Sequence, residues 1–133
     1  QSGFEVGPEI PFGIDPSLTW DNLAELVNRH PADGLRIAGV LETLQGALGE
    51  DWSVFAERIS GIGSGRMVGD GYLGEFCIKY TCDGDSGAIY LDQATQQVSV
   101  IWHIEGEQFD HIWPENKDEM PDAMREYLAS RGI

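Results

Sequence analysis

The sequence predicts an α+β fold in which helices come first, an antiparallel meander of about four to five strands follows, and one C-terminal helix closes the chain. Apolar residues recur at spacings of three and four up to about residue 60. From about residue 72, segments rich in β-branched and aromatic residues alternate with short turns, and strands linked in this way pair antiparallel. This order of elements is typical of the α+β class.

Three helices are expected in the first half of the chain. The apolar spacing predicts them over Trp20–His30, over 34–48 and in a short segment that begins near residue 52. The apolar stripe of the third helix consists of Trp52, Phe55 and Ile59. Residues suited to a helix beginning or end flank these segments: Thr19, Pro31, Gly49 and Asp51.

The second half predicts a sheet and one more helix. Glycines interrupt residues 61–71, which favours a hairpin or a mobile loop there. A final helix is expected over Pro121–Arg131, where proline suits the first turn and Gly132 suits the end. The expected strands are Tyr72–Tyr80, Ala88–Leu91, Val98–Ile104 and a shorter one at Gln108–Ile112.

Length and composition predict one domain over residues 1–133. Residues 1–18 are rich in proline and glycine and are expected to form an irregular arm, with one edge strand near Phe4–Val6. No apolar run approaches 18 residues, so no segment is expected to enter a membrane.

The charge is strongly negative and restricts the class of partner. Eight basic residues stand against 23 acidic ones, which gives a net charge of −15. Nucleic acid and anionic membrane surfaces both require clustered basic residues, so neither is an expected partner. A basic protein would be attracted at long range. The alternative interpretation is that the acidity serves solubility alone.

The segment Cys82–Gly87 resembles the sequence around the nucleophile of chymotrypsin-like proteases, with Ser86 in the nucleophile position. That chemistry needs a histidine to take the serine proton and an aspartate to orient the histidine. None of the three histidines, His30, His103 and His111, has the protease context. Because Asp, Gly and Ser are also typical of β-turns, a turn is the preferred interpretation.

No other motif predicts a cofactor or a metal. The glycine-rich segment lacks the G-x-G-x-x-G spacing, and two cysteines with scattered histidines do not form a zinc site. One alternative remains, in which a small enzyme or ligand-binding domain uses Trp102, His103, His111 and Trp113 around a pocket. Aromatic residues on strands more often belong to the core.

Cys77 and Cys82 form a close pair, and the sequence between them is Ile78, Lys79, Tyr80 and Thr81. The even number and the close spacing favour a disulfide, with two free thiols as the alternative. A disulfide would contribute about 2 kcal/mol and would hold the enclosed residues in one shape. It would also imply an oxidising compartment such as the bacterial periplasm. The start Gln1-Ser2-Gly3 fits either a mature end after signal-peptide removal or a tag remnant.

The segment "GYLGEFCIKYTCDGDSGAIYLDQATQQVSVIWHIEGE", about residues 71–107, resembles the Ivy-type inhibitors of lysozyme. That family has a strand, a Cys-Lys-Pro-His-Asp-Cys loop, and then strands of the pattern a-i-y-l-d … t-x-q-v. The two cysteines match those of the family. The loop departs from the family at Lys79, Tyr80 and Thr81, which stand in place of Pro, His and Asp.

The resemblance implies an inhibitor without catalytic residues, whose bridged loop enters the active-site cleft of a peptidoglycan-degrading glycosidase. It further implies a partner-binding site at Ile78, Lys79, Tyr80 and Thr81, with rim contacts from Asp83 and Asp85. Lysine and tyrosine still offer hydrogen-bond donors to the carboxylates that such enzymes use.

The altered loop and the acidity also resemble the immunity proteins of type VI secretion systems. Such a protein would be periplasmic after signal-peptide removal and would block one cognate cell-wall hydrolase, expected to be basic. An immunity protein against a peptidoglycan amidase is an alternative, and in that case the loop need not be the binding surface.

Overall fold

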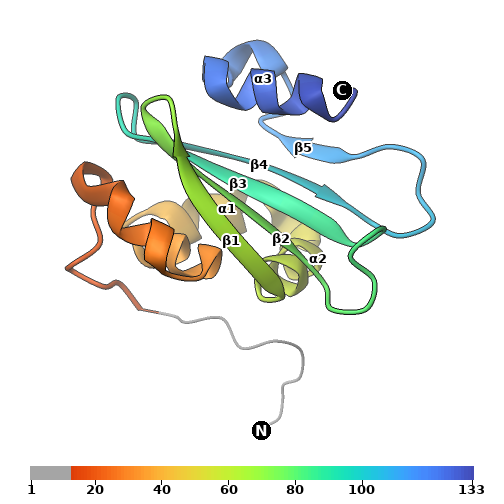
Figure 1. Cartoon of the computed structure of the whole chain (residues 1–133), viewed down its shortest axis with the longest axis horizontal. Helices are drawn as coiled ribbons and strands as arrows, with labels where there is room; N and C mark the ends of the chain where they lie inside the picture. The colour runs from red at the N-terminus through yellow and green to blue at the C-terminus, as the bar shows by residue number, and fades with distance from the viewer. Residues whose placement is uncertain (1–12) are drawn as a thin grey trace, which may run out of the picture.

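Five strands form one antiparallel sheet in strict chain order, β1-β2-β3-β4-β5, with helices on both of its faces (Figure 1). The computed structural model describes residues 13–133, so the edge strand expected near Phe4–Val6 lies outside the described residues. The predicted α+β arrangement is confirmed. The elements are η1 (Trp20–Asn28), η2 (Pro31–Arg36), α1 (Val40–Leu48), η3 (Gly49–Asp51), α2 (Trp52–Ile59), β1 (Ile62–Val68), β2 (Gly71–Cys77), β3 (Ser86–Asp92), β4 (Gln97–His103), β5 (His111–Trp113), η4 (Lys117–Glu119) and α3 (Asp122–Ser130).

The first helical segments differ from their prediction. η1 is a 3-10 helix, although its cap is as expected: the Thr19 side chain accepts from the backbone of Asp21, and Asn22 closes a capping box. The helix expected over 34–48 is broken into η2 and α1. The break contains Gly39, whose φ of 91° is unfavourable for other residues and ends the helical path.

The later elements agree more closely with the prediction. The third helix is α2, but the Asp51 side chain makes no capping hydrogen bond. Pro121 is the N-cap of α3 rather than a residue within it. The expected strand Tyr72–Tyr80 ends earlier, at Cys77, because the chain turns into the loop. The last strand begins at His111, later than the expected Gln108–Ile112.

β1 is a strand that the sequence did not predict. Of the two alternatives for residues 61–71, a hairpin or a mobile loop, the structure has a hairpin, whose second strand is β2. β1 pairs with β2 along its whole length, from Ile62 opposite Cys77 to Val68 opposite Gly71. The glycines allow a close approach within the sheet. A Cβ atom at Gly65 would lie 2.1 Å from the Tyr72 hydroxyl oxygen, so the ring of this buried tyrosine occupies the place of a side chain.

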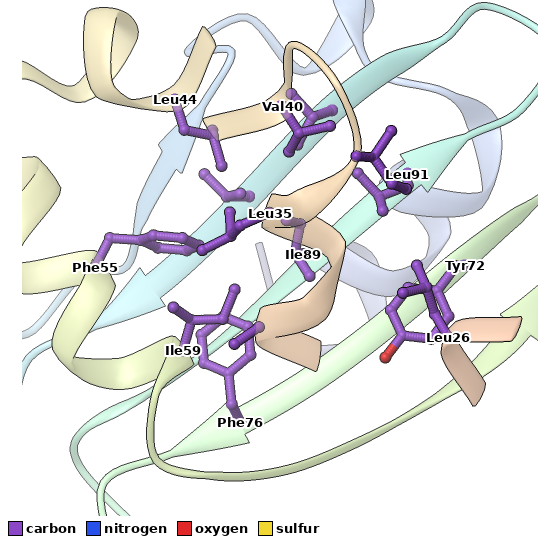
Figure 2. Packing of buried hydrophobic residues seen from close by; sticks show 14 of the residues in the cluster. Leu26, Leu35, Val40, Leu44, Phe55, Ile59, Tyr72, Phe76, Ile89 and Leu91 are labelled. Carbon is purple, nitrogen blue, oxygen red and sulfur yellow. The ribbon is translucent and has the colours of Figure 1, made fainter. Parts of the chain in front are cut away.

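Each face of the sheet carries its own apolar core. On one face, η1, η2, α1 and α2 pack against β2, β3 and β4, and Figure 2 shows side chains of this cluster, among them Leu44, Phe55 and Ile89. On the other face, Met124 and Leu128 of α3 pack against Tyr90 and Ile101. Helices therefore cover much of both faces, although Ile62 in β1 remains 53 % exposed.

Candidate binding loop

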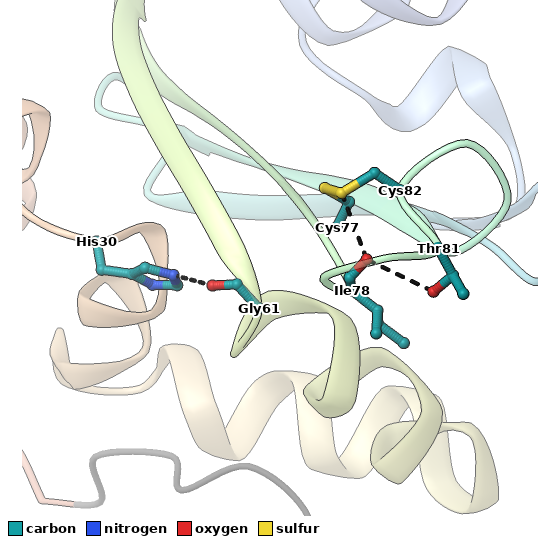
Figure 3. The surroundings of a disulfide bond; sticks show 6 residues. All are labelled: His30, Gly61, Cys77, Ile78, Thr81 and Cys82. Atoms are coloured by element: carbon teal, nitrogen blue, oxygen red, sulfur yellow. Dashed lines mark hydrogen bonds between the residues drawn. A yellow bond between two sulfur atoms is a disulfide. The ribbon is translucent and has the colours of Figure 1, made fainter.

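The β2–β3 connection is a short loop closed by a disulfide. Cys77 at the end of β2 is bridged to Cys82, with 4.8 Å between their Cα atoms (Figure 3). Inside the bridge the Thr81 N–H donates to the Ile78 carbonyl oxygen at 3.0 Å, which forms a tight turn. The Ile78 N–H donates to the carbonyl oxygen of Asp85, which follows the bridge in sequence, at 2.9 Å. The disulfide and these hydrogen bonds define one shape for the loop.

The tip of the loop exposes a large aromatic side chain. Tyr80 is 90 % exposed, and the Lys79 ammonium lies 5.1 Å from the centre of its ring. The backbone φ of Tyr80 is 76°, in the left-handed region that bulky residues rarely adopt. Such a conformation costs on the order of 1–3 kcal/mol and persists only where the surroundings enforce it. The loop therefore holds an exposed tyrosine in a strained and defined position.

Asp85 fixes the end of the loop to the body of the protein. Its carboxylate contacts the buried guanidinium of Arg58 in α2 at 2.6 Å and accepts a hydrogen bond from the Glu105 N–H at 2.9 Å. The hydrogen bond from Glu105 is the main cause that lowers the pKa of Asp85 below its usual value, and Arg58 adds to it. Arg58 also donates to the carbonyl oxygens of His103 and Val54, both at 2.8 Å.

His103 connects the same loop to the next one. Its Nδ1 lies 2.5 Å from the Gly84 carbonyl oxygen, and its Nε2 lies 2.9 Å from that of Glu107. Only the protonated ring can donate to both oxygens. The Gly84 carbonyl is the main cause that raises the pKa of His103. Glu107 and Asp110 act in the same direction, whereas burial and Arg131 oppose it.

The stability that His103 contributes should therefore be lost as pH rises above the ordinary range of a histidine. The pKa of His103 is raised in the folded state. Its contribution to the free energy of unfolding is therefore fully present below about pH 6.5, the pKa in the unfolded chain, and is lost as pH rises through the pKa in the folded protein. Denaturant unfolding at pH 5.5 and pH 8 should show this loss, and His103→Gln should reduce it. The expected difference is about 0.5–1.5 kcal/mol, the size of one hydrogen bond. An equal pH dependence in both proteins would contradict the role of His103.

Ser86 is the first residue of β3 rather than part of the turn, which the Cys82–Gly84 segment forms. It pairs with His103 in the strand register. Both ring nitrogens of that histidine face backbone carbonyls, and the neighbouring Asp85 is paired with Arg58. The described residues thus hold no serine–histidine–aspartate arrangement around Ser86.

The pocket residues considered from the sequence come together only in part. Trp102 and Trp113 line a pocket of about 310 Å³ with His111, whose ring stacks on Trp102 at 5.2 Å between ring centres. His103 does not line this pocket. Within residues 13–133, no group of three His, Cys, Asp or Glu side chains could hold a metal ion, and no helix is long and apolar enough to cross a membrane.

The site residues predicted from sequence lie together on the one loop, with Asp83 exposed and Asp85 largely enclosed. Arg58 and His103 were missed as groups that hold it, because they come from α2 and β4. One signal was available for Arg58. It lies three residues after Phe55, on the buried face of α2, where a charged residue needs a partner.

The loop is short, closed by a disulfide and held from two sides, so it forms a protrusion of preformed shape. The chain belongs to the Ivy family, described as inhibitor of vertebrate lysozyme, whose model matches residues 39–131. This match extends the resemblance seen over residues 71–107 back through α1 and α2 and forward through α3. The family is one of inhibitors, and a lysozyme-like hydrolase is the kind of partner that it implies.

One curated relative carries no functional description. The chain is 30% identical over 91 residues to an uncharacterized protein, y4bG, from Sinorhizobium fredii. The aligned part covers 68% of this chain and 34% of the relative, so the chain spans about a third of that protein's length. No solved structure matches the chain significantly.

Proposed function

We propose that this protein inhibits a peptidoglycan-degrading glycosidase by placing the loop Ile78–Thr81 in the active-site cleft of that enzyme. The observation that carries the proposal is the exposed, strained Tyr80 at the tip of a disulfide-closed loop. A loop with one shape loses little conformational entropy when it binds, so its contacts contribute more fully to affinity.

The loop has the chemistry to engage a carboxylate pair. Lys79 supplies an ammonium group and Tyr80 a phenolic hydroxyl, and both are hydrogen-bond donors. Glycosidases of this kind use two carboxyl groups on either side of the scissile bond. A donor that occupies this position would exclude the substrate, and a charge-assisted hydrogen bond there is about twice as strong as a neutral one.

We further propose that the target is a cognate toxin and that this protein acts as a periplasmic immunity protein of a type VI secretion system. The loop differs from the family pattern at Lys79, Tyr80 and Thr81, which favours a specialised target over a general lysozyme. The net charge of −15 favours a basic partner, whose association would slow as salt is added.

Substitutions at Tyr80 should weaken inhibition without unfolding the protein. Tyr80→Asn should raise the inhibition constant by about 30-fold or more, as for other central aromatic contacts. Asparagine tolerates the left-handed conformation, so the loop should keep its shape. Tyr80→Phe, which removes only the hydroxyl, should cost about 10-fold. The measurement is inhibition of peptidoglycan hydrolysis by a panel of glycosidases and amidases.

Gln93→Ala is the matched control, because residue 93 is exposed and lies in the β3–β4 turn at the opposite end of the sheet. It should leave inhibition unchanged. Full inhibition by Tyr80→Asn would reject the loop as the binding site. Inhibition of an amidase alone would reject the glycosidase mechanism.

A further inference from the structure

The β2–β3 loop and the β4–β5 loop, residues 104–110, lie at the same end of the sheet (Figure 1). In an antiparallel meander, alternate connections fall at the same end. The binding loop of the proposed function therefore has a neighbour that is far from it in sequence.

The two loops are joined by specific contacts. The Asp85 carboxylate accepts the Glu105 N–H, and His103 bridges the carbonyl oxygens of Gly84 and Glu107. The backbone at Gly84 approaches Glu105 so closely that an added Cβ would lie 2.7 Å from the glutamate Cβ. Such contacts make the two loops one unit, so a partner seated on one of them would meet the other.

The second loop exposes an aromatic side chain of its own. Phe109 is 74 % exposed, and with Tyr80 it is one of the two most exposed large apolar side chains among residues 13–133. A single exposed apolar residue is ordinary. Two exposed aromatic residues on coupled loops at one end of the sheet are typical of an interface, where aromatic residues are enriched.

Both loops carry acidic residues. Segment 104–110 contains three acidic residues and no basic one. Asp110 is paired with Arg131 at 3.3 Å, and Glu107 contacts His111. Asp83 and Glu105 take part in no side-chain ion pair within the described part of the chain, so their charges remain available. The surface fits a partner that combines an apolar recess with basic side chains around it.

We infer that residues 104–110 form a second limb of the binding surface, in which Phe109 enters an apolar recess of a basic hydrolase beside the cleft that receives Tyr80. This inference rests on the proposed function. Phe109 supplies apolar contact area, and the carboxylates of Asp83 and Glu105 face basic side chains of the same partner.

Phe109→Ser should weaken binding of the hydrolase about 10- to 100-fold, measured as the dissociation constant by calorimetry, while the melting temperature stays unchanged. Met67→Ser is the matched control, because it removes a 40 % exposed apolar side chain near the opposite end of the sheet. The control should bind as tightly as the unaltered protein.

A photoreactive phenylalanine analogue at position 109 provides a second readout. It should cross-link to the hydrolase, and the same analogue at position 67 should not. Failure of the unaltered protein to bind any hydrolase would reject the proposed function. Normal binding by Phe109→Ser, with no cross-link from position 109, would reject the second limb and leave the proposed function intact.

Discussion

Arg58→Met should lower the free energy of unfolding by about 3 kcal/mol and should also weaken inhibition. Arg58 is 4 % exposed, and its guanidinium donates to Asp85, to the His103 carbonyl and to the Val54 carbonyl. Removing it leaves a largely enclosed carboxylate without its cationic partner, the most costly way to break such a pair. Urea unfolding measures the stability, and the inhibition constant measures the position of the loop.

Two further variants make this prediction specific. Arg66→Met breaks an exposed ion pair with Glu75 and should cost less than about 1 kcal/mol. Adding Asp85→Asn to Arg58→Met should recover part of the lost stability, because the unpaired charge is then gone. If the double variant recovers stability but not inhibition, the Arg58–Asp85 pair serves to position the β2–β3 loop. If Arg58→Met costs no more than Arg66→Met, the pair does not anchor the loop.

Phe55→Ala should lower the free energy of unfolding by about 3–5 kcal/mol, the range for a buried phenylalanine. The ring is fully buried and contacts Trp52, Phe76 and Trp102, with centre distances of 6.1, 5.6 and 5.9 Å. Through Phe76 and Trp102 it holds α2 against β2 and β4. Figure 2 shows the ring of Phe55 pointing from α2 into the cluster. For a domain of this size, the melting temperature should drop by roughly 10–20 °C.

Phe109→Ala is the control for this measurement, since the same side chain is removed from a 74 % exposed position. It should change stability by less than about 0.5 kcal/mol. α2 also carries Arg58, so the Phe55 variant should lose inhibition together with stability. A loss of less than about 1 kcal/mol would mean that the helix docks mainly through other contacts.

The sequence predicted those elements whose apolar pattern is set by their own residues. α2 follows from the stripe of Trp52, Phe55 and Ile59, and the meander follows from alternating segments with short turns. The Cys77–Cys82 pair is likewise local, and its predicted disulfide is present.

What the sequence did not predict depends on contacts between distant segments. β1 looks like a loop because of its glycines. The folded chain shows why the strand needs them, since the Tyr72 ring packs over Gly65, and the β2 backbone and Pro31 lie close to Gly63. The break at Gly39 depends on a positive φ that no periodicity reveals. Arg58 lies 27 residues from Asp85, so its link to the loop exists only in the folded chain.

The strict chain order of the strands has a practical consequence. The turns that follow β1 and β3 lie at the end of the sheet that faces away from the disulfide-closed loop (Figure 1). A fluorophore or a surface tether attached at exposed Ala94 would leave the loop end unobstructed. The β3–β4 turn is therefore a suitable attachment site for immobilisation or single-molecule observation while the other end of the sheet binds a hydrolase.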